Sequence, residues 1–291
     1  MAEVMGGPPS GPELGTLARL TGVFFSPAKT FESIARKPGW NWLVPVVLVM
    51  AAFFVSQSAT VTKIDIDDAV KMQMKFVDKM AGANLTSEKR AEIVEQTRQG
   101  MEKQKSPVRR GLNTLFIFIP VLIVPLIYHG LGAAFGTKTR YLTVVAGYAY
   151  TQVIQVIPQL LTAAVAWPRE TLDASDVQFA RVLKSNLGAF LDFDTTSKAL
   201  LAVASSVDVF DIWAFFVGSI AVSKTTRFSP RGARYVVGGV WLAYILLKID
   251  LEQTWDVLKA ADLWWFGLAV TIMIVTALPM ALRWKWLLAA Q

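Results

Sequence analysis

Lys198-Ala-Leu-Leu-Ala-Val-Ala-Ser-Ser-Val-Asp208-Val-Phe-Asp211-Ile-Trp213 precedes an apolar run that ends at Val222. Two aspartates, three residues apart, interrupt what would otherwise be a single membrane span. A carboxylate in hydrocarbon is costly, by roughly 3 kcal/mol on insertion scales. Asp208 and Asp211 therefore either mark the point where a membrane helix begins or have a function inside the membrane.

In the first alternative the two acids belong to a helix start. Ser205 to Asp208 fits a capping box. Asp208 to Asp211 offers a second register, in which an acid caps the helix and another acid adds negative charge to the first turn, where the helix dipole favours it. The span then runs from Asp208 to Ser223, which is about 16 residues and roughly 24 Å long. Residues 199–204 would form a separate short helix on or in the outer leaflet.

In the second alternative a single helix runs from Lys198 to Lys224. Both acids then lie near the middle of the membrane, face the bundle, and bind a cation or a proton. We favour the first alternative, because the serines and the length of the span both fit it.

The whole chain has the composition of a polytopic membrane protein. Its 291 residues are 54% hydrophobic and 18% charged, with a mean hydropathy of +0.43. The apolar residues come in long blocks, which is typical of membrane helices. We therefore predict an all-α helical bundle with five spans, a sixth C-terminal span and an extramembrane helical hairpin. The expected spans are residues 42–60, 112–134, 141–167, 208–223, 235–247 and 263–282.

Three segments are expected outside the membrane core. Residues 1–14 are rich in Gly and Pro and predict a flexible tail. A short helix after Pro27 either lies in the headgroup layer or packs on the bundle, and its expected apolar face is Ala28, Phe31, Ile34 and Ala35. Residues 61–111 predict a helical hairpin whose second helix opens at Thr86-Ser87-Glu88. This hairpin either presents a solvated face or binds a partner.

Several polar residues fall inside the predicted spans. Gln152, Gln155 and Gln159 share one helical face in the third span, where amides can hydrogen-bond between helices. A substrate path is the alternative interpretation. The only histidine, His129, lies late in the second span. It is expected either to be neutral and hydrogen-bonded inside the bundle or to lie at the inner interface. Pro120 and Pro125 predict kinks in that span.

Charge patterning predicts the orientation of the bundle. The net charge is +7, and the cations flank apolar segments, which favours a lipid surface over nucleic acid as the anionic partner. The N-terminal segment and residues 138–140, 224–234 and 283–285 are basic, so both termini are expected in the cytoplasm. Residues 61–111 are also rich in cations, but a segment of that length obeys the positive-inside rule poorly.

Enzyme signatures are missing from the sequence. The chain has no cysteine, which excludes disulfides and thiolate sites. It has no HExxH motif, no G-x-S-x-G elbow and no P-loop. We predict no catalytic residues, no cofactor and no metal site.

Several motifs in order resemble the Yip-one domain family, named for proteins that interact with Ypt/Rab GTPases. They cover about residues 15–247. The resemblance implies a five-span membrane domain with a cytosolic N-terminus and, as in eukaryotic members, a role linked to vesicle trafficking. The motifs are Phe25-Ser-Pro-Ala-Lys-Thr-Phe-Glu-Ser-Ile34 with Pro38 and Trp40-Asn-Trp42, His129-Gly-Leu-Gly132, Tyr141 to Ala149, and Ser206-Val-Asp-Val-Phe-Asp-Ile-Trp213.

The tail has a second resemblance. Residues 248–291 read as an amphipathic connector and a sixth span, closed by Arg283-Trp-Lys-Trp286. They resemble the start of the lysylphosphatidylglycerol synthase transmembrane, or flippase-like, family. Because the further spans of that family do not follow, we expect either a fusion with a truncated second part or a gene cut short.

Taken together, the sequence predicts a non-enzymatic integral protein of the cell membrane, such as a bacterial inner membrane. It would act in membrane organisation or trafficking-like partner binding. The alternative is a transporter or a lipid-handling, flippase-like protein. Expected partners are membrane lipids, with other proteins or a second copy of the chain possible, and no nucleic acid.

Overall fold

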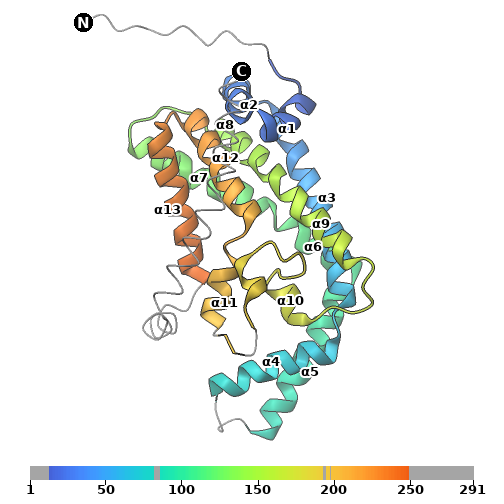
Figure 1. Ribbon diagram of the computed structural model, residues 1–291. Helices are drawn as coiled ribbons and strands as arrows, with labels where there is room; N and C mark the ends of the chain where they lie inside the picture. The colour runs from blue at the N-terminus through green and yellow to red at the C-terminus, as the bar shows by residue number, and fades with distance from the viewer. Residues whose placement is uncertain (1–12, 82–85, 193–194, 197, 249–291) are drawn as a thin grey trace, which may run out of the picture.

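The computed structural model describes residues 13–81, 86–192, 195–196 and 198–248 (Figure 1). Within these residues the secondary structure is helical apart from two isolated β-bridges. The predicted all-α fold is confirmed. The helices are α1 (Thr16–Phe25), α2 (Pro27–Arg36), η1 (Trp40–Trp42), α3 (Leu43–Thr60), η2 (Val61–Lys63), α4 (Ile66–Ala81), α5 (Ser87–Lys105), α6 (Pro107–Leu115), α7 (Phe118–Ala134), α8 (Tyr141–Thr151), η4 (Gln152–Gln155), α9 (Val156–Ala166), α10 (Ala174–Gln178), η5 (Leu187–Phe190), α11 (Lys198–Ser205), α12 (Val209–Thr226) and α13 (Pro230–Lys248).

Four helical segments of the described chain are long and apolar enough to cross a membrane. They are Trp40–Lys63, Pro107–Ala134, Tyr141–Ala166 and Val209–Thr226. Helix α13 occupies the predicted fifth span but falls short of that apolarity, because two arginines lie in its first turns. The predicted sixth span lies outside the described residues. The chain is thus a polytopic membrane protein, and the number of spans stays a prediction.

Prolines divide two of these segments. α6 and α7 are separated at residues 116–117, four residues before Pro120, because the proline ring clashes with the carbonyl four positions earlier. In the same way η4 precedes Pro158 between α8 and α9. Pro125, in contrast, stays within α7. The Tyr141 hydroxyl donates 2.7 Å to the Leu122 carbonyl, in the turn before Pro125. It thus adds a partner to a turn that the proline weakens.

The N-terminal helices pack on the bundle. α2 begins with Pro27 at its first turn, as predicted, and its Phe31 and Ile34 are fully buried. It contacts α8 and α12, so packing on the bundle is observed, whereas a place in the headgroup layer stays a prediction. Ala28, on the expected apolar face, is exposed. Helix α1 was not predicted from the sequence, and it lies beside α2 (Figure 1).

The opposite end of the bundle carries the hairpin of α4 and α5 (Figure 1). As the sequence predicts, Thr86 caps α5, accepting a hydrogen bond from the Lys89 amide at 3.3 Å. Lys63, in η2, joins the segment after α3 to the end of α9 and the loop that follows it. Its ammonium group donates to the carbonyls of Ala166, at 3.1 Å, of Trp167 and of Arg169, at 2.6 Å. A cation thereby satisfies the last carbonyls of α9, where the helix dipole favours it.

Small residues allow the membrane helices to approach closely. Gly147 of α8 faces Thr225 of α12, and a Cβ atom on this glycine would lie 2.7 Å from the Thr225 Cγ2. Such contacts let backbones pack without a hydrophobic driving force between helices in lipid. The central core lies nearby, with Tyr150 and Ile154 fully buried.

Candidate functional site

Asp208 stands at the start of α12. Its Oδ1 accepts a hydrogen bond from the Phe210 amide at 2.7 Å, which makes it the N-cap. Helix α11 ends at Ser205, so the chain forms two helices, as in the first alternative above, rather than one from Lys198 to Lys224. An aspartate cap satisfies one of the free amides of the first turn and is favoured by the helix dipole.

The capping box expected at Ser205 to Asp208 is not formed. The Ser205 hydroxyl is buried without a hydrogen-bond partner, and Ser206 donates 2.8 Å back to the Ala202 carbonyl inside the preceding turn. The serines belong to the end of α11, because the chain turns at residues 206–208. The expectation of a capping box at Ser205 was wrong. The observed start is the second register, with Asp208 as the cap and Asp211 in the first turn.

Asp208 also fastens a distant loop to the helix start. The Ser185 hydroxyl donates to Asp208 Oδ2, and the Val209 amide donates 3.2 Å to the Ser185 carbonyl. Asn186 in turn forms an isolated antiparallel bridge with Asp208. Because Ser185 is 23 residues away from Asp208, no local sequence pattern indicates this contact.

Asp211 connects two membrane helices. The Gln155 Nε2 donates to Asp211 Oδ1 at 2.9 Å, so η4 is joined to the first turn of α12. Gln152 and Gln159 are half-buried. The face expected on a continuous α-helix is altered by η4, in which residues three apart lie directly above one another. The structure thus brings Asp211 and Gln155 together and leaves Asp208 with the loop.

His129 lies apart from the aspartates. Its ring meets that of Tyr141 edge-on, with centroids 6.0 Å apart, and its Nδ1 is buried without a hydrogen-bond partner. The hydrogen bond expected for His129 is therefore not seen at this nitrogen. Within the described residues, no three His, Cys, Asp or Glu residues are grouped in a way that could hold a metal ion.

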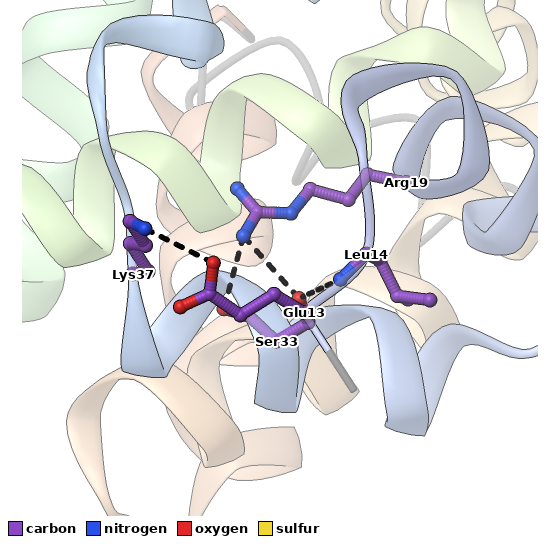
Figure 2. Close-up of polar contacts among 5 residues, drawn as sticks. All are labelled: Glu13, Leu14, Arg19, Ser33 and Lys37. Atoms are coloured by element: carbon purple, nitrogen blue, oxygen red, sulfur yellow. Dashed lines mark hydrogen bonds and ion pairs between the residues drawn. The ribbon is translucent and has the colours of Figure 1, made fainter. Parts of the chain in front are cut away.

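A polar junction ties the start of the described chain to α2 (Figure 2). The Arg19 Nη2 donates to the carbonyl and to the hydroxyl oxygen of Ser33, both at 3.2 Å, and the Leu14 amide donates to the same hydroxyl oxygen at 3.2 Å. Lys37 pairs with Glu13 at 3.0 Å on the surface. Glu13 and Leu14, placed in the tail by the sequence analysis, therefore contact α2.

Arg19 is the unusual member of this junction, because only 3% of its surface is exposed. A buried cation is costly unless it is compensated. Its partner carbonyl, Ser33 O, belongs to the last turn of α2, the negative end of the helix dipole. Arg19 thus holds α1 against the end of α2, and its Nε remains unpartnered. Sequence reasoning missed this role, because nothing local marks Arg19 as buried.

At the hairpin end the surface has an open hollow. It lies between η2, α5 and the loop after α9, and is lined by Lys63, Arg98 and Lys105 together with Asp65, Asp67 and Glu170. Lys63 and Lys105 are engaged with backbone carbonyls and Arg98 with Asp67. The hollow therefore has no set of free groups converging on one point.

These features define a class of protein: an all-α polytopic membrane protein with a packed N-terminal helix pair at one end and a helical hairpin at the other. A family model described as the Yip1 domain matches residues 21–249. The chain belongs to the Yip1 domain family, which confirms the resemblance seen in the sequence. No curated protein and no solved structure matches the chain. Residues 250–291 lie outside the family match, and the flippase-like resemblance of the tail, which falls outside the described residues, stays a prediction.

Proposed function

We propose that this protein has a non-enzymatic role in the membrane and acts through contacts with other proteins, made by the hairpin of α4 and α5. The observation that carries the proposal is that α5, 19 residues long, has no buried residue. A helix that is polar all round gains little from its own fold and is typical of a surface that meets solvent or another molecule.

Polar contacts join the two helices of the hairpin to each other and to its base. The Arg98 Nη2 lies 2.7 Å from Asp67 Oδ1, which joins α5 to α4. Lys105 donates 2.8 Å to the Ile64 carbonyl at the base. These contacts support a hairpin held in one orientation above the span that it follows. The partner is a protein, either another chain or a second copy of this one.

The proposed location is the cell membrane, with the N-terminus in the cytoplasm. Ten Lys and Arg and two Glu occur in residues 13–37, 138–140 and 224–234, which supports a cytoplasmic position for that end. Since the chain has no cysteine, single cysteines report orientation directly. A cysteine at Gln99 should react with an impermeant thiol reagent added outside intact cells, and one at Ser229 should not. The reverse pattern would overturn this orientation.

Site-specific photocrosslinking in native membranes tests the role of the hairpin. A photoreactive amino acid at Glu92 or Gln99, both exposed on α5, should give discrete crosslinked protein bands, identified by mass spectrometry. The matched control is Leu126, which is 57% exposed on α7, inside the candidate span Pro107–Ala134. Crosslinks to lipid alone from the α5 positions would refute the proposal. A band of twice the chain mass would identify a second copy as the partner.

A transporter or lipid-handling function is the second candidate. It is favoured by one observation, the interruption of the third span at η4 beside the bond between Gln155 and Asp211. Interrupted helices with polar partners are used for binding sites in transporters. In this case Asp211→Asn would abolish a pH-dependent uptake. In contrast, labelling of cysteines at 206–208 from outside, with no uptake lost in Asp211→Asn, would support the partner-binding role.

A further inference from the structure

The end of the bundle that carries α1 and α2 has an unbalanced charge. We call it the basic end and define it as residues 13–37, 135–140 and 224–234, with ten Lys and Arg against two Glu. Both glutamates are engaged, Glu13 with Lys37 and Glu32 with Lys224. Besides Lys29, five exposed cations of the basic end form no ion pair within the part of the chain that the structure describes. They are Lys138, Arg140, Arg227, Arg231 and Arg234.

These five cations come from two connections that the structure holds together, the turn between α7 and α8 and the segment that runs from the end of α12 into the first turns of α13. We call them the two basic turns. Phe135, after α7, packs edge-on against Phe228, after α12, with ring centroids 5.9 Å apart. Gly132 lies against Thr226, because a Cβ on this glycine would be 3.8 Å from the Thr226 Cβ. The two basic turns are therefore neighbours in space although they are about 90 residues apart in sequence.

The two turns also stand at a defined depth. Three candidate spans end or begin beside them, at Ala134, Tyr141 and Thr226. A residue directly beyond the end of a span lies at the level of the lipid headgroups. Exposed aromatic side chains accompany the cations, with Phe135 72% and Tyr235 80% exposed. Aromatic rings next to cations are the composition that favours the headgroup layer.

We propose that the turns at 135–140 and 227–234 form a binding surface for the headgroups of anionic phospholipids in the adjoining leaflet. Arginine offers forked donors that match the oxygens of a phosphate, and four of the five cations are arginines. This goes beyond the proposed function, because it concerns the end opposite to the hairpin and does not depend on a protein partner.

The test is lipid binding to the full chain purified in a neutral detergent. The chain is titrated with short-chain phosphatidylglycerol or short-chain phosphatidylcholine, and the bound lipid is counted by native mass spectrometry. We expect preferential binding of phosphatidylglycerol. The triple substitution Arg227→Gln, Arg231→Gln and Arg234→Gln should weaken that binding by about fivefold per cation removed.

The matched control removes three cations from the hairpin, with Arg90→Gln, Arg98→Gln and Lys103→Gln, and should leave the lipid preference unchanged. The wild-type chain gives a second measurement that needs no variant. Its affinity for phosphatidylglycerol should fall between about 50 mM and about 500 mM salt, as screening grows, while binding of phosphatidylcholine stays constant.

Three outcomes would overturn the proposal. Equal binding of the two lipids would show that the surface does not recognise the negative charge of the headgroup. An equal loss in the hairpin control would show a general effect of net charge. Full competition by glycerol phosphate at the concentration of the lipid would assign the surface to a soluble phosphate. Failure of the crosslinking experiment on α5 leaves this test unaffected, so the two proposals can fail separately.

Discussion

The two ends of this bundle differ in the balance of cations and acids and in how far the charged side chains are paired within the protein. The basic end has ten cations and two acids, whereas the hairpin end, residues 61–111 and 168–211, has 15 of each. At the hairpin end, charges meet partners within the protein, as Arg90 with Asp78, Arg98 with Asp67 and Arg181 with Asp176. At the basic end most cations face outward without a protein partner.

The difference shows that each end is held together by different forces. Close helix packing and one buried arginine hold the basic end, so its surface charges are free to meet lipid. The hairpin end has polar segments joined by caps, carbonyl contacts and ion pairs, of which Arg90 with Asp78 and Arg98 with Asp67 are exposed. Substitutions that disturb helix packing at the basic end should therefore cause the largest losses of unfolding free energy. Substitutions of charged groups at the hairpin end should cause the smallest.

The largest effect is expected for Gly147→Leu. The new side chain would collide with Thr225 and push α8 away from α12, so we expect a loss of about 3 kcal/mol in unfolding free energy. Denaturation of the detergent-solubilised protein measures it. Gly130→Leu is the control, because a Cβ there meets nothing within 4 Å. Equal losses in both variants would contradict the close contact between these helices.

Arg19→Ala should have the next largest effect. It removes two hydrogen bonds from a buried guanidinium to Ser33, and hydrogen bonds to charged groups contribute about 1.5–3 kcal/mol each. Some of this is offset because a buried charge disappears, which leaves an expected loss of about 2 kcal/mol in unfolding free energy. Lys29→Ala, on the exposed side of α2, serves as the control. If it is equally costly in the same denaturation assay, Arg19 is not what holds α1.

At the hairpin end, Asp208→Ala should cost about 1 kcal/mol by removing the cap of α12. Asp208→Asn keeps an acceptor oxygen and should cost less. Asp173 is a suitable comparison, since it precedes α10 without forming a side-chain cap. Thermal unfolding followed by helical circular dichroism would rank the three variants. An Asp173→Ala variant as unstable as Asp208→Ala would argue against capping as the cause.

The smallest effect is expected for the ion pair of Arg98 with Asp67. Their side chains are 45% and 66% exposed, and exposed pairs contribute about 0.2–1 kcal/mol. A double-mutant cycle with Arg98→Ala and Asp67→Ala measures the coupling, which should shrink at high salt. A coupling that salt does not change would mean that the hairpin end, too, depends on a buried contact.

The sequence predicts the parts of this fold that depend on local pattern. Apolar runs located four spans, and Pro27 and Thr86 marked the starts of α2 and α5, because these signals act within a few residues. The loop between α9 and α11 read only as a polar segment. Its conformation depends on the hydrogen bond of Lys63 to the Arg169 carbonyl and on that of Ser185 to Asp208, each of which joins residues more than 20 positions apart. Such pairing has no local signature.

The same distinction separates the candidate site residues. The helix start at Asp208 could be inferred from nearby residues, and its bond to Ser185 could not. Gln155 was expected to bond between helices, but its partner, Asp211, depends on how α12 lies against η4. The burial of Arg19 depends on the docking of α1, a helix of ten residues whose sequence alone gives no reason to expect it.

Arg227 ends α12 in the left-handed conformation, with φ of 61°, which in an L-residue other than glycine costs about 1 kcal/mol. Glycine would occupy this position more easily. Arg227→Gly should therefore raise the melting temperature while it weakens the binding of anionic lipid. At position 227, glycine then favours thermal stability and arginine favours lipid binding. A chain selected only for thermostability would be expected to lose this arginine.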